Sequence, residues 1–209
     1  MIVRILLVAA LAALSGGCAY RAAPVDAPSY SVVTSFSEKI HGKWLLAVSA
    51  DALNQSVKSS TYACSFHNFP LELSGVYATS VAETLRNVFD QLEQIPTPIP
   101  GDQARKRGAK GVIVVRGEEV RPRLDIQPGF WTANMKTQVL VVASVYVDGP
   151  KGRIFGTTVE GQGIADAEAG VMCEGGAKSL ETASSTAIRD SVRKLAEALG
   201  NSDRVRSLK

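Results

Sequence analysis

A long stretch of alternating side chains at residues 134–148 constrains the fold more than any other part of the chain. Successive side chains of a β-strand point to opposite faces, so every second residue shares a face. One face of this stretch would carry Met135, Thr137, Val139, Val141, Ala143, Val145 and Val147. The turn sequence Asp-Gly-Pro-Lys-Gly follows at residues 148–152, and residues 153–163 are typical of a returning strand. We therefore predict a long β-hairpin.

Two segments have the apolar spacing of amphipathic helices, residues 77–94 and residues 180–199. The apolar positions are Val81, Leu85, Val88, Phe89 and Leu92 in the first segment and Leu180, Ala183, Ala187, Ile188, Val192, Leu195 and Leu199 in the second. Ser80 and Glu83 have the spacing of a capping box in the first helix. Pro96 follows the end of that helix, and Gly200 ends the second.

Shorter strands are predicted at residues 43–49 and 112–115, and the second continues to Leu124. Pro122 cannot donate a backbone hydrogen bond, so this continuation should lie at an edge or contain a bulge. Residues 62–73 should form an extended segment or a second short strand. The order of strand, helix, three strands and helix predicts a two-layer α+β sandwich, a mostly antiparallel sheet of about four strands with two helices packed on one face.

The N-terminus has the features of a secretion signal. Arg4 precedes an apolar run at residues 5–14 that is too short to cross a bilayer, which needs about 20 apolar residues. The following sequence, Leu14-Ser15-Gly16-Gly17-Cys18, resembles the lipobox of bacterial lipoproteins, in which a peptidase cuts before a cysteine whose thiol carries a diacylglyceryl group. The alternative is an ordinary secretory signal that leaves Cys18 as a free thiol.

The lipobox implies a division of the chain into four parts. Residues 1–17 would be the signal peptide, and residues 18–40, rich in Ala, Pro and Ser, an acylated N-terminus and flexible tether. Residues 41–200 would form a single domain, and residues 201–209 a frayed tail. Because Ala rather than Asp follows Cys18, the resemblance implies sorting to the outer membrane, lipid-anchored through palmitate and other acyl chains and facing the periplasm.

Cys64 and Cys173 remain as an even pair in an oxidising compartment once Cys18 is lipidated. We predict a disulfide between them, which would close a loop of about 109 residues and contribute about 4 to 5 kcal/mol on the chain-entropy model. The alternative is two buried thiols too far apart to pair. The chain has no Cys-x-x-Cys motif, which disfavours a thiol redox centre.

The motifs of common catalytic sites do not occur in the sequence. It contains neither Gly-x-Ser-x-Gly nor His-Glu-x-x-His, and His41 and His67 lack the neighbours of a catalytic triad. The two histidines and three cysteines are scattered, and four ligands for a zinc or iron–sulfur centre would have to come from nearly all of them, which disfavours such a centre. A net charge of +3, evenly spread, excludes a typical nucleic-acid binder. We expect no enzyme activity, no metal, no cofactor and no nucleic-acid partner.

Two loops are candidates for binding. Phe130 and Trp131 follow Pro-Gly between two strands, and they form either an exposed tip that docks into a partner or a cap on the open end of the sheet. Residues 105–110 carry four cations, Arg105, Lys106, Arg107 and Lys110. That segment either binds phosphate or an anionic lipid, or is a solvated loop.

The lipobox, the tether and the order of helices and strands resemble small outer-membrane lipoproteins of Gram-negative bacteria, such as the lipopolysaccharide-assembly and ABC-type transport auxiliary lipoproteins. The resemblance implies a non-enzymatic accessory or scaffold in cell-envelope assembly or transport. The loop with Phe130 and Trp131, or an exposed sheet edge, would contact an envelope protein complex. Two alternatives are a lipid-binding auxiliary subunit with an acyl chain between helices and sheet, and a periplasmic hydrolase that uses His41 or His67.

Overall fold

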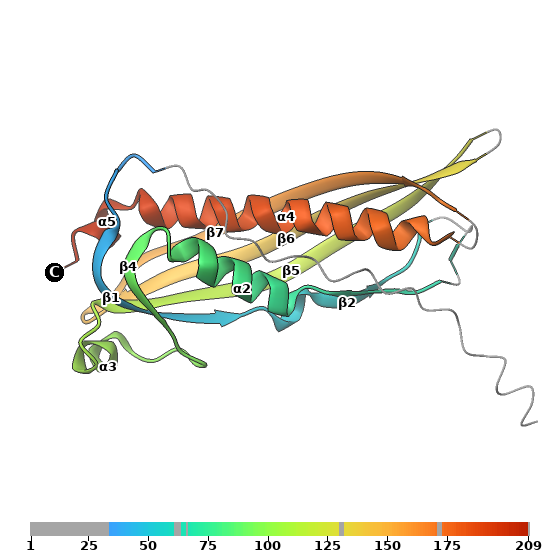
Figure 1. Ribbon diagram of the computed structural model, residues 1–209. Helices are drawn as coiled ribbons and strands as arrows, with labels where there is room; N and C mark the ends of the chain where they lie inside the picture. The colour runs from blue at the N-terminus through green and yellow to red at the C-terminus, as the bar shows by residue number, and fades with distance from the viewer. Residues whose placement is uncertain (1–33, 61–63, 66, 130–131, 171–172, 209) are drawn as a thin grey trace, which may run out of the picture.

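The computed structural model describes residues 34–60, 64–65, 67–129, 132–170 and 173–208 of the chain. Its elements, in chain order, are β1 (Ile40–Ser49), η1 (Asp51–Leu53), β2 (Asn54–Val57), β3 (Phe69–Glu72), α2 (Ser74–Leu85), β4 (Phe89–Gln94), α3 (Gly101–Lys106), β5 (Gly111–Pro128), β6 (Ala133–Gly149), β7 (Gly152–Glu168), α4 (Gly175–Gly200) and α5 (Asp203–Arg206). The long helix α4 lies along the sheet (Figure 1).

The main sheet has five strands in the order β4-β1-β5-β6-β7, and β2 and β3 form a separate antiparallel pair. The α+β class is confirmed, as is the hairpin, which comprises β6 and β7. The expectation of a mostly antiparallel sheet of about four strands is wrong. β1 pairs in parallel with both β4 and β5, whereas the ladders between β5, β6 and β7 are antiparallel.

The missing strand is β4, which the sequence analysis assigned to the end of the first helix. Helix α2 begins at Ser74 and ends at Leu85, and the chain then turns into β4. The ring of Phe89 packs against Trp44 of β1, with 5.4 Å between the centroids. Ser80, expected near the helix start, lies in the middle of α2 and is buried. The capping box is therefore also wrong.

The prediction that two helices pack on one face is confirmed for α2 and α4. Their apolar side chains join those of the sheet in one core, which includes Tyr77, Val81, Leu85, Ile113, Leu124, Val141, Ile188, Val192 and Leu195. A third, short helix lies on the opposite face, because Ala104 of α3 packs with Leu45 and Val112 in a second, smaller cluster. That second cluster covers only the end of the sheet that β1 reaches.

The predicted position of Pro122 at a strand edge is confirmed. β1 pairs with β5 only up to Arg116, and the register of β5 against β6 shifts between Gly117 and Glu119. Pro122 lies beyond that shift and pairs with Val139 of β6 on its other side. Its missing N–H therefore breaks no ladder with β1.

Helix α4 lies so close to β7 that only glycine fits at two positions of the strand. A side chain on Gly161 would clash with the backbone oxygen of Ala187, and one on Gly163 would clash with that of Ala183. Backbone atoms cannot rotate away as a flexible side chain does, so both positions require glycine. The helix and sheet are thus in direct contact here, and no space remains between them for an acyl chain.

Side chains of α4 also cover the free edge of β7. Asp190 Oδ2 accepts a hydrogen bond from the backbone N–H of Gln162 at 3.2 Å, and Lys194 Nζ donates to the backbone oxygen of Glu160 at 2.8 Å. Burial raises the pKa of Asp190, but hydrogen bonds from Lys194 and Arg193 outweigh it and hold that pKa below its usual value. The middle of this edge is consequently closed to an added strand.

Both ends of the described domain are tied down where the sequence predicts mobile segments. The tail forms α5, with Val205 fully buried and the Ser202 side chain capping the helix. Arg206 donates to the backbone oxygen of Glu38 at 3.0 Å and stacks over the ring of Phe36. The frayed tail therefore does not match the structure, and residues 34–40 belong to the domain rather than to the tether.

Tyr77 makes stability depend on pH in the alkaline range. Burial raises its pKa to about 12, although the hydrogen bond with Ser191, 3.2 Å between the oxygens, works in the opposite direction. Since the folded pKa lies above the ordinary value of 10.0, this stability is complete below pH 10 and is lost as the pH rises towards 12. We expect the urea midpoint of the wild type to fall more steeply over this range than that of Tyr77→Phe. Parallel curves for the two proteins would contradict the assignment.

Candidate interaction surfaces

The predicted anchor and the predicted aromatic loop lie outside the described residues, whereas the basic residues 105–110 are described. The predicted roles of Cys18, Phe130 and Trp131 therefore stay predictions. The strands that lead to Phe130 and Trp131 are described, and their ends are held together by a hydrogen bond from the Gly129 N–H to the Thr132 oxygen at 2.7 Å. The β5–β6 hairpin extends past the helices at one end of the molecule (Figure 1).

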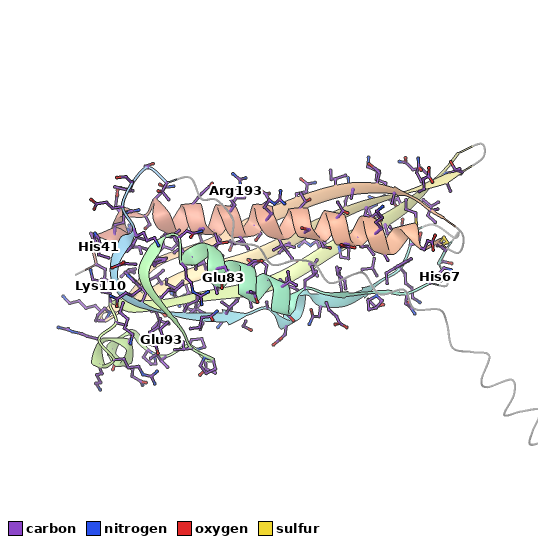
Figure 2. The ribbon with its side chains drawn as sticks, viewed as in Figure 1. His41, His67, Glu83, Glu93, Lys110 and Arg193 are labelled. Atoms are coloured by element: carbon purple, nitrogen blue, oxygen red, sulfur yellow. A yellow bond between two sulfur atoms is a disulfide. The ribbon has the colours of Figure 1, made fainter. Side chains whose placement is uncertain are left out.

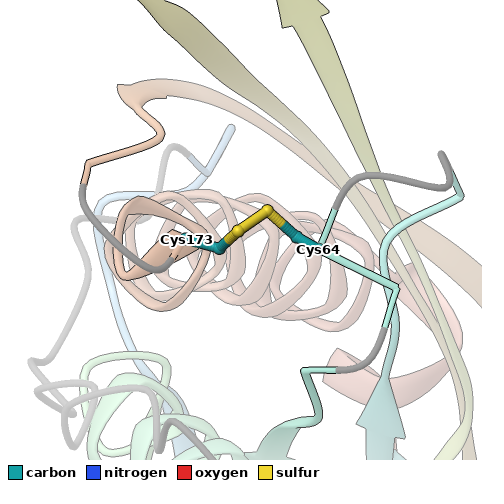
Figure 3. The surroundings of a disulfide bond; sticks show 2 residues. All are labelled: Cys64 and Cys173. Atoms are coloured by element: carbon teal, nitrogen blue, oxygen red, sulfur yellow. A yellow bond between two sulfur atoms is a disulfide. The ribbon is translucent and has the colours of Figure 1, made fainter.

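The predicted disulfide between Cys64 and Cys173 is present in the structure (Figure 3). It joins the connection between β2 and β3 to the residues just before α4, with 6.0 Å between the Cα atoms. Both cysteines have positive φ angles, 64° and 67°, a conformation that side-chain-bearing residues rarely adopt. The disulfide therefore connects two loops at the N-terminal end of α4.

The two histidines lie at opposite ends of the molecule (Figure 2). His67 is 1% exposed and lies beside the disulfide. Its backbone N–H donates to the backbone oxygen of Cys64 at 3.0 Å. His41 is exposed at the start of β1, with its ring nitrogens 3.7 Å from Glu38 and 4.0 Å from Asp90. They do not share a site.

The face of β5, β6 and β7 that points away from α4 carries an apolar strip of Leu140, Val142 and Ile164. Leu140 and Val142 alternate along β6 with residues buried under α4, so they point the other way. Ile164 lies on the same face of β7, where its neighbours Gly163 and Ala165 are buried, and it is 48% exposed. A single exposed aliphatic side chain is ordinary, but apolar side chains gathered on one sheet face with a polar border are a candidate contact surface.

Charged side chains border this apolar strip and mostly pair with one another. Arg121, which is opposite Leu140, donates two hydrogen bonds to Glu119, at 2.7 and 2.6 Å. These bonds lower the pKa of Glu119 and raise that of Arg121. Arg123 pairs likewise with Asp125 at 2.8 Å. Exposed pairs of this kind add little stability, so they contribute a polar rim rather than a structural support.

The sheet edges are less available than the sequence analysis supposed. Besides the covered edge of β7, the free edge of β5 beyond β1 has residues 54–60 alongside it. Gln55 donates to the backbone oxygen of Val120 at 3.0 Å, and the Ser60 N–H donates to that of Leu124 at 2.9 Å. Strand addition is therefore blocked in these stretches of β5 and β7.

The residues that the structure describes supply two further observations. None of their helices is both long and apolar enough to cross a membrane. Within the same ranges, no three or more His, Cys, Asp and Glu side chains gather as metal ligands would.

The apolar strip was not predicted from the sequence, because Ile164 lies one residue beyond the expected end of its strand at residue 163.

No protein-family model matches the chain, and no curated protein matches it. Solved bacterial proteins are similar to it at low identity. A Xanthomonas campestris protein of the DUF330 family is 9% identical, with a TM-score of 0.49 over 86% of this chain and 93% of that one. A putative neuraminyllactose-binding hemagglutinin homolog from Helicobacter pylori is 11% identical, with a TM-score of 0.49 over 82% and 90%.

The Neisseria meningitidis lipoprotein GNA1162 is 8% identical, with a TM-score of 0.28 over 58% of this chain and 83% of that one. All three TM-scores lie below 0.5, so these similarities carry no argument about this chain.

Proposed function

We propose that the protein is a lipoprotein anchored in the outer membrane through Cys18, faces the periplasm, and acts as a non-enzymatic accessory or scaffold for an envelope protein complex in assembly or transport. The apolar strip carries this proposal, because Ile164 is exposed and Leu140 and Val142 are half-buried on a sheet face that none of the described helices covers along this part. The partner protein would present apolar side chains opposite the strip and charged side chains opposite the charged pairs that border it.

The alternative role as an acyl-chain carrier has less support. It needs space between the helices and the sheet, and α4 lies directly on Gly161 and Gly163 of β7. Fully buried side chains such as Tyr77, Leu124 and Ile188 occupy the rest of that interface. We therefore do not propose it.

Anchoring predicts the behaviour of Cys18→Ala. In cells fed a labelled fatty acid, we expect the wild type to incorporate label and the variant to lose it, because its side chain has no thiol to acylate. The measurement is label per unit protein in the membrane and soluble fractions. Equal labelling of the two proteins would refute Cys18 as the anchor.

The scaffold role predicts that Ile164→Glu weakens partner binding. A carboxylate in the apolar centre of an interface is costly to desolvate, so we expect at least about tenfold less of the partner to co-purify with the membrane-extracted variant. Since Ile164 is 48% exposed, the urea midpoint of the free protein should change little.

The matched control for this experiment is Thr182→Glu, which puts the same charge on an exposed position of α4. It should retain the partner. Equal recovery of the partner by the wild type, Ile164→Glu and Thr182→Glu would show that the apolar strip is not the contact surface, and the same comparison then applies to Trp131→Ala.

A further inference from the structure

A basic cleft of about 490 Å³ lies at the end of the molecule that carries α3 and α5. Three segments far apart in the sequence line it: the end of α3 and the residues after it, the turn between β6 and β7, and the residues after α5. Its cations are Arg105, Lys110 and Lys151. The rest of its lining is uncharged, namely Gly108, Ala109, Gly149, Pro150, Ile154 and Leu208.

Two cations near the cleft, Arg153 and Lys43, have carboxylate partners. Arg153 is hydrogen-bonded to Asp148 and lies over the Tyr146 ring at 3.8 Å. Lys43 pairs with Glu93 at 2.7 Å, and that contact is the main cause of the lowered pKa of Glu93.

No ion pair links Arg105, Lys110 or Lys151 to a carboxylate among the residues that the structure describes. Like charges repel, so three cations around one cleft raise each other's energy unless an anion binds between them. The uncharged lining adds apolar surface from Ile154 and Leu208. The cleft therefore suits a ligand with an anionic group next to an apolar part.

The chain enters the domain at this same end. The Ser35 N–H donates to Asn201 Oδ1 at 2.6 Å, just after α4, and Arg206 of α5 holds Phe36 and Glu38. Leu208, which lines the cleft, follows directly after α5. Lys110 is at this end too, whereas His67 and the disulfide are at the other (Figure 2).

A short segment of chain separates a lipid on Cys18 from the point where the chain enters the domain at this end. The segment from Cys18 to Thr34 spans at most roughly 58 Å when fully extended. The membrane that holds the acyl chains is consequently within reach of the cleft, and it presents phosphate groups attached to apolar chains.

We propose that this cleft binds the headgroup phosphate of an anionic phospholipid in the membrane that anchors the chain. Arg105, Lys110 and Lys151 would donate hydrogen bonds to the phosphate oxygens, and Ile154 and Leu208 would contact the apolar part of the same lipid. This inference rests on the proposed anchoring through Cys18. It goes further because it gives the domain an orientation, with the basic cleft on the membrane and the β5–β6 hairpin directed away from it.

Amine labelling of the full chain in vesicles tests the proposal. The protein is reconstituted in phosphatidylcholine vesicles with or without phosphatidylglycerol, treated with an acylating reagent, and analysed by mass spectrometry at each lysine. We expect labelling of Lys110 and Lys151 to fall at least about fivefold in the anionic vesicles, and high salt to restore it. Lys106, on α3 but outside the cleft, and Lys58, exposed in the connection after β2, are internal controls and should change much less.

A charge reversal provides the second arm of the test. Lys151→Glu should restore labelling of Lys110 in anionic vesicles, whereas Lys58→Glu should not. Equal labelling of Lys110 in neutral and anionic vesicles, or an equal fall at Lys106, would overturn the proposal. Protection of detergent-solubilised protein by inorganic phosphate alone would also overturn it, since the ligand would then be a free anion.

Failure of the anchor itself is measured separately. Flotation with neutral vesicles reports the anchor without headgroup charge, and there the acylated wild type should float, whereas a Cys18→Ala chain that begins at residue 18 should not. If the wild type does not float with neutral vesicles but Lys110 is still protected in anionic vesicles, the anchor is refuted and the cleft proposal stands.

Discussion

Gly163→Ala is expected to lower the free energy of unfolding by about 3 kcal/mol or more, the upper range for overpacking of a filled core. The added methyl group would overlap the backbone oxygen of Ala183. Relief requires α4 to move off β7, which also strains the bonds that Asp190 and Lys194 make to the strand edge. Urea unfolding, followed by far-ultraviolet circular dichroism, measures the change.

Gly156→Ala is the matched control for this prediction. Gly156 lies in the same strand, but a methyl group there would meet nothing nearer than 3.8 Å. Its free energy of unfolding should change by no more than about 1 kcal/mol, and in the stabilising direction if the stiffer unfolded chain dominates. If both alanine variants unfold at the same urea concentration, the close packing of α4 on β7 is not what requires glycine at position 163.

Loss of the Cys64–Cys173 disulfide is expected to cost about 4 kcal/mol. The two cysteines are 109 residues apart, so the bond removes much of the freedom of the unfolded chain. The double variant Cys64→Ala/Cys173→Ala should therefore unfold at a much lower urea concentration than the oxidised wild type.

Reduction provides the control for the disulfide. Dithiothreitol should lower the midpoint of the wild type to nearly that of the double variant and leave the double variant unchanged. A wild-type midpoint that does not respond to complete reduction, verified by thiol titration, would show that the bond adds nothing to stability.

The parts of the fold that the sequence predicts well are those with a long, regular period. β6 alternates over its whole length, and α4 keeps its apolar stripe from Leu180 to Leu199, so local pattern and tertiary burial agree. The disulfide was predictable for a different reason, since only two cysteines remain if Cys18 is lipidated.

β4 was not predictable because its pattern fits two structures. Val88, Phe89 and Leu92 continue the helical spacing of α2, and a strand of six residues is too short to show its own period. Its strand conformation depends on pairing with β1, a contact that the local sequence does not contain. That error removed one of the two parallel neighbours of β1, and the other, β5, was not predicted to pair with it in parallel, although a helix between two strands permits such pairing.

The candidate surfaces were harder to predict than the fold because each combines distant segments. The apolar strip needs the register of β6 against β7, in which Gln138 is opposite Ile164 and Leu140 is opposite Gln162. The basic cleft needs α3, the β6–β7 turn and the chain after α5 to meet at one end. The sequence indicated the cations at residues 105–110, but Lys151 and Leu208 join them only in the folded chain.

Coverage of the β7 edge has a consequence for aggregation. A strand of 17 residues at the side of a sheet offers a row of unpaired N–H and C=O groups, on which chains of the same kind can grow into fibrils. In the native state Asp190 and Lys194 occupy such groups at the middle of β7. The aggregation-prone species is then not the unfolded chain but an intermediate in which α4 has detached and the sheet persists. Conditions that detach α4 alone should therefore produce fibrils before they unfold the protein completely.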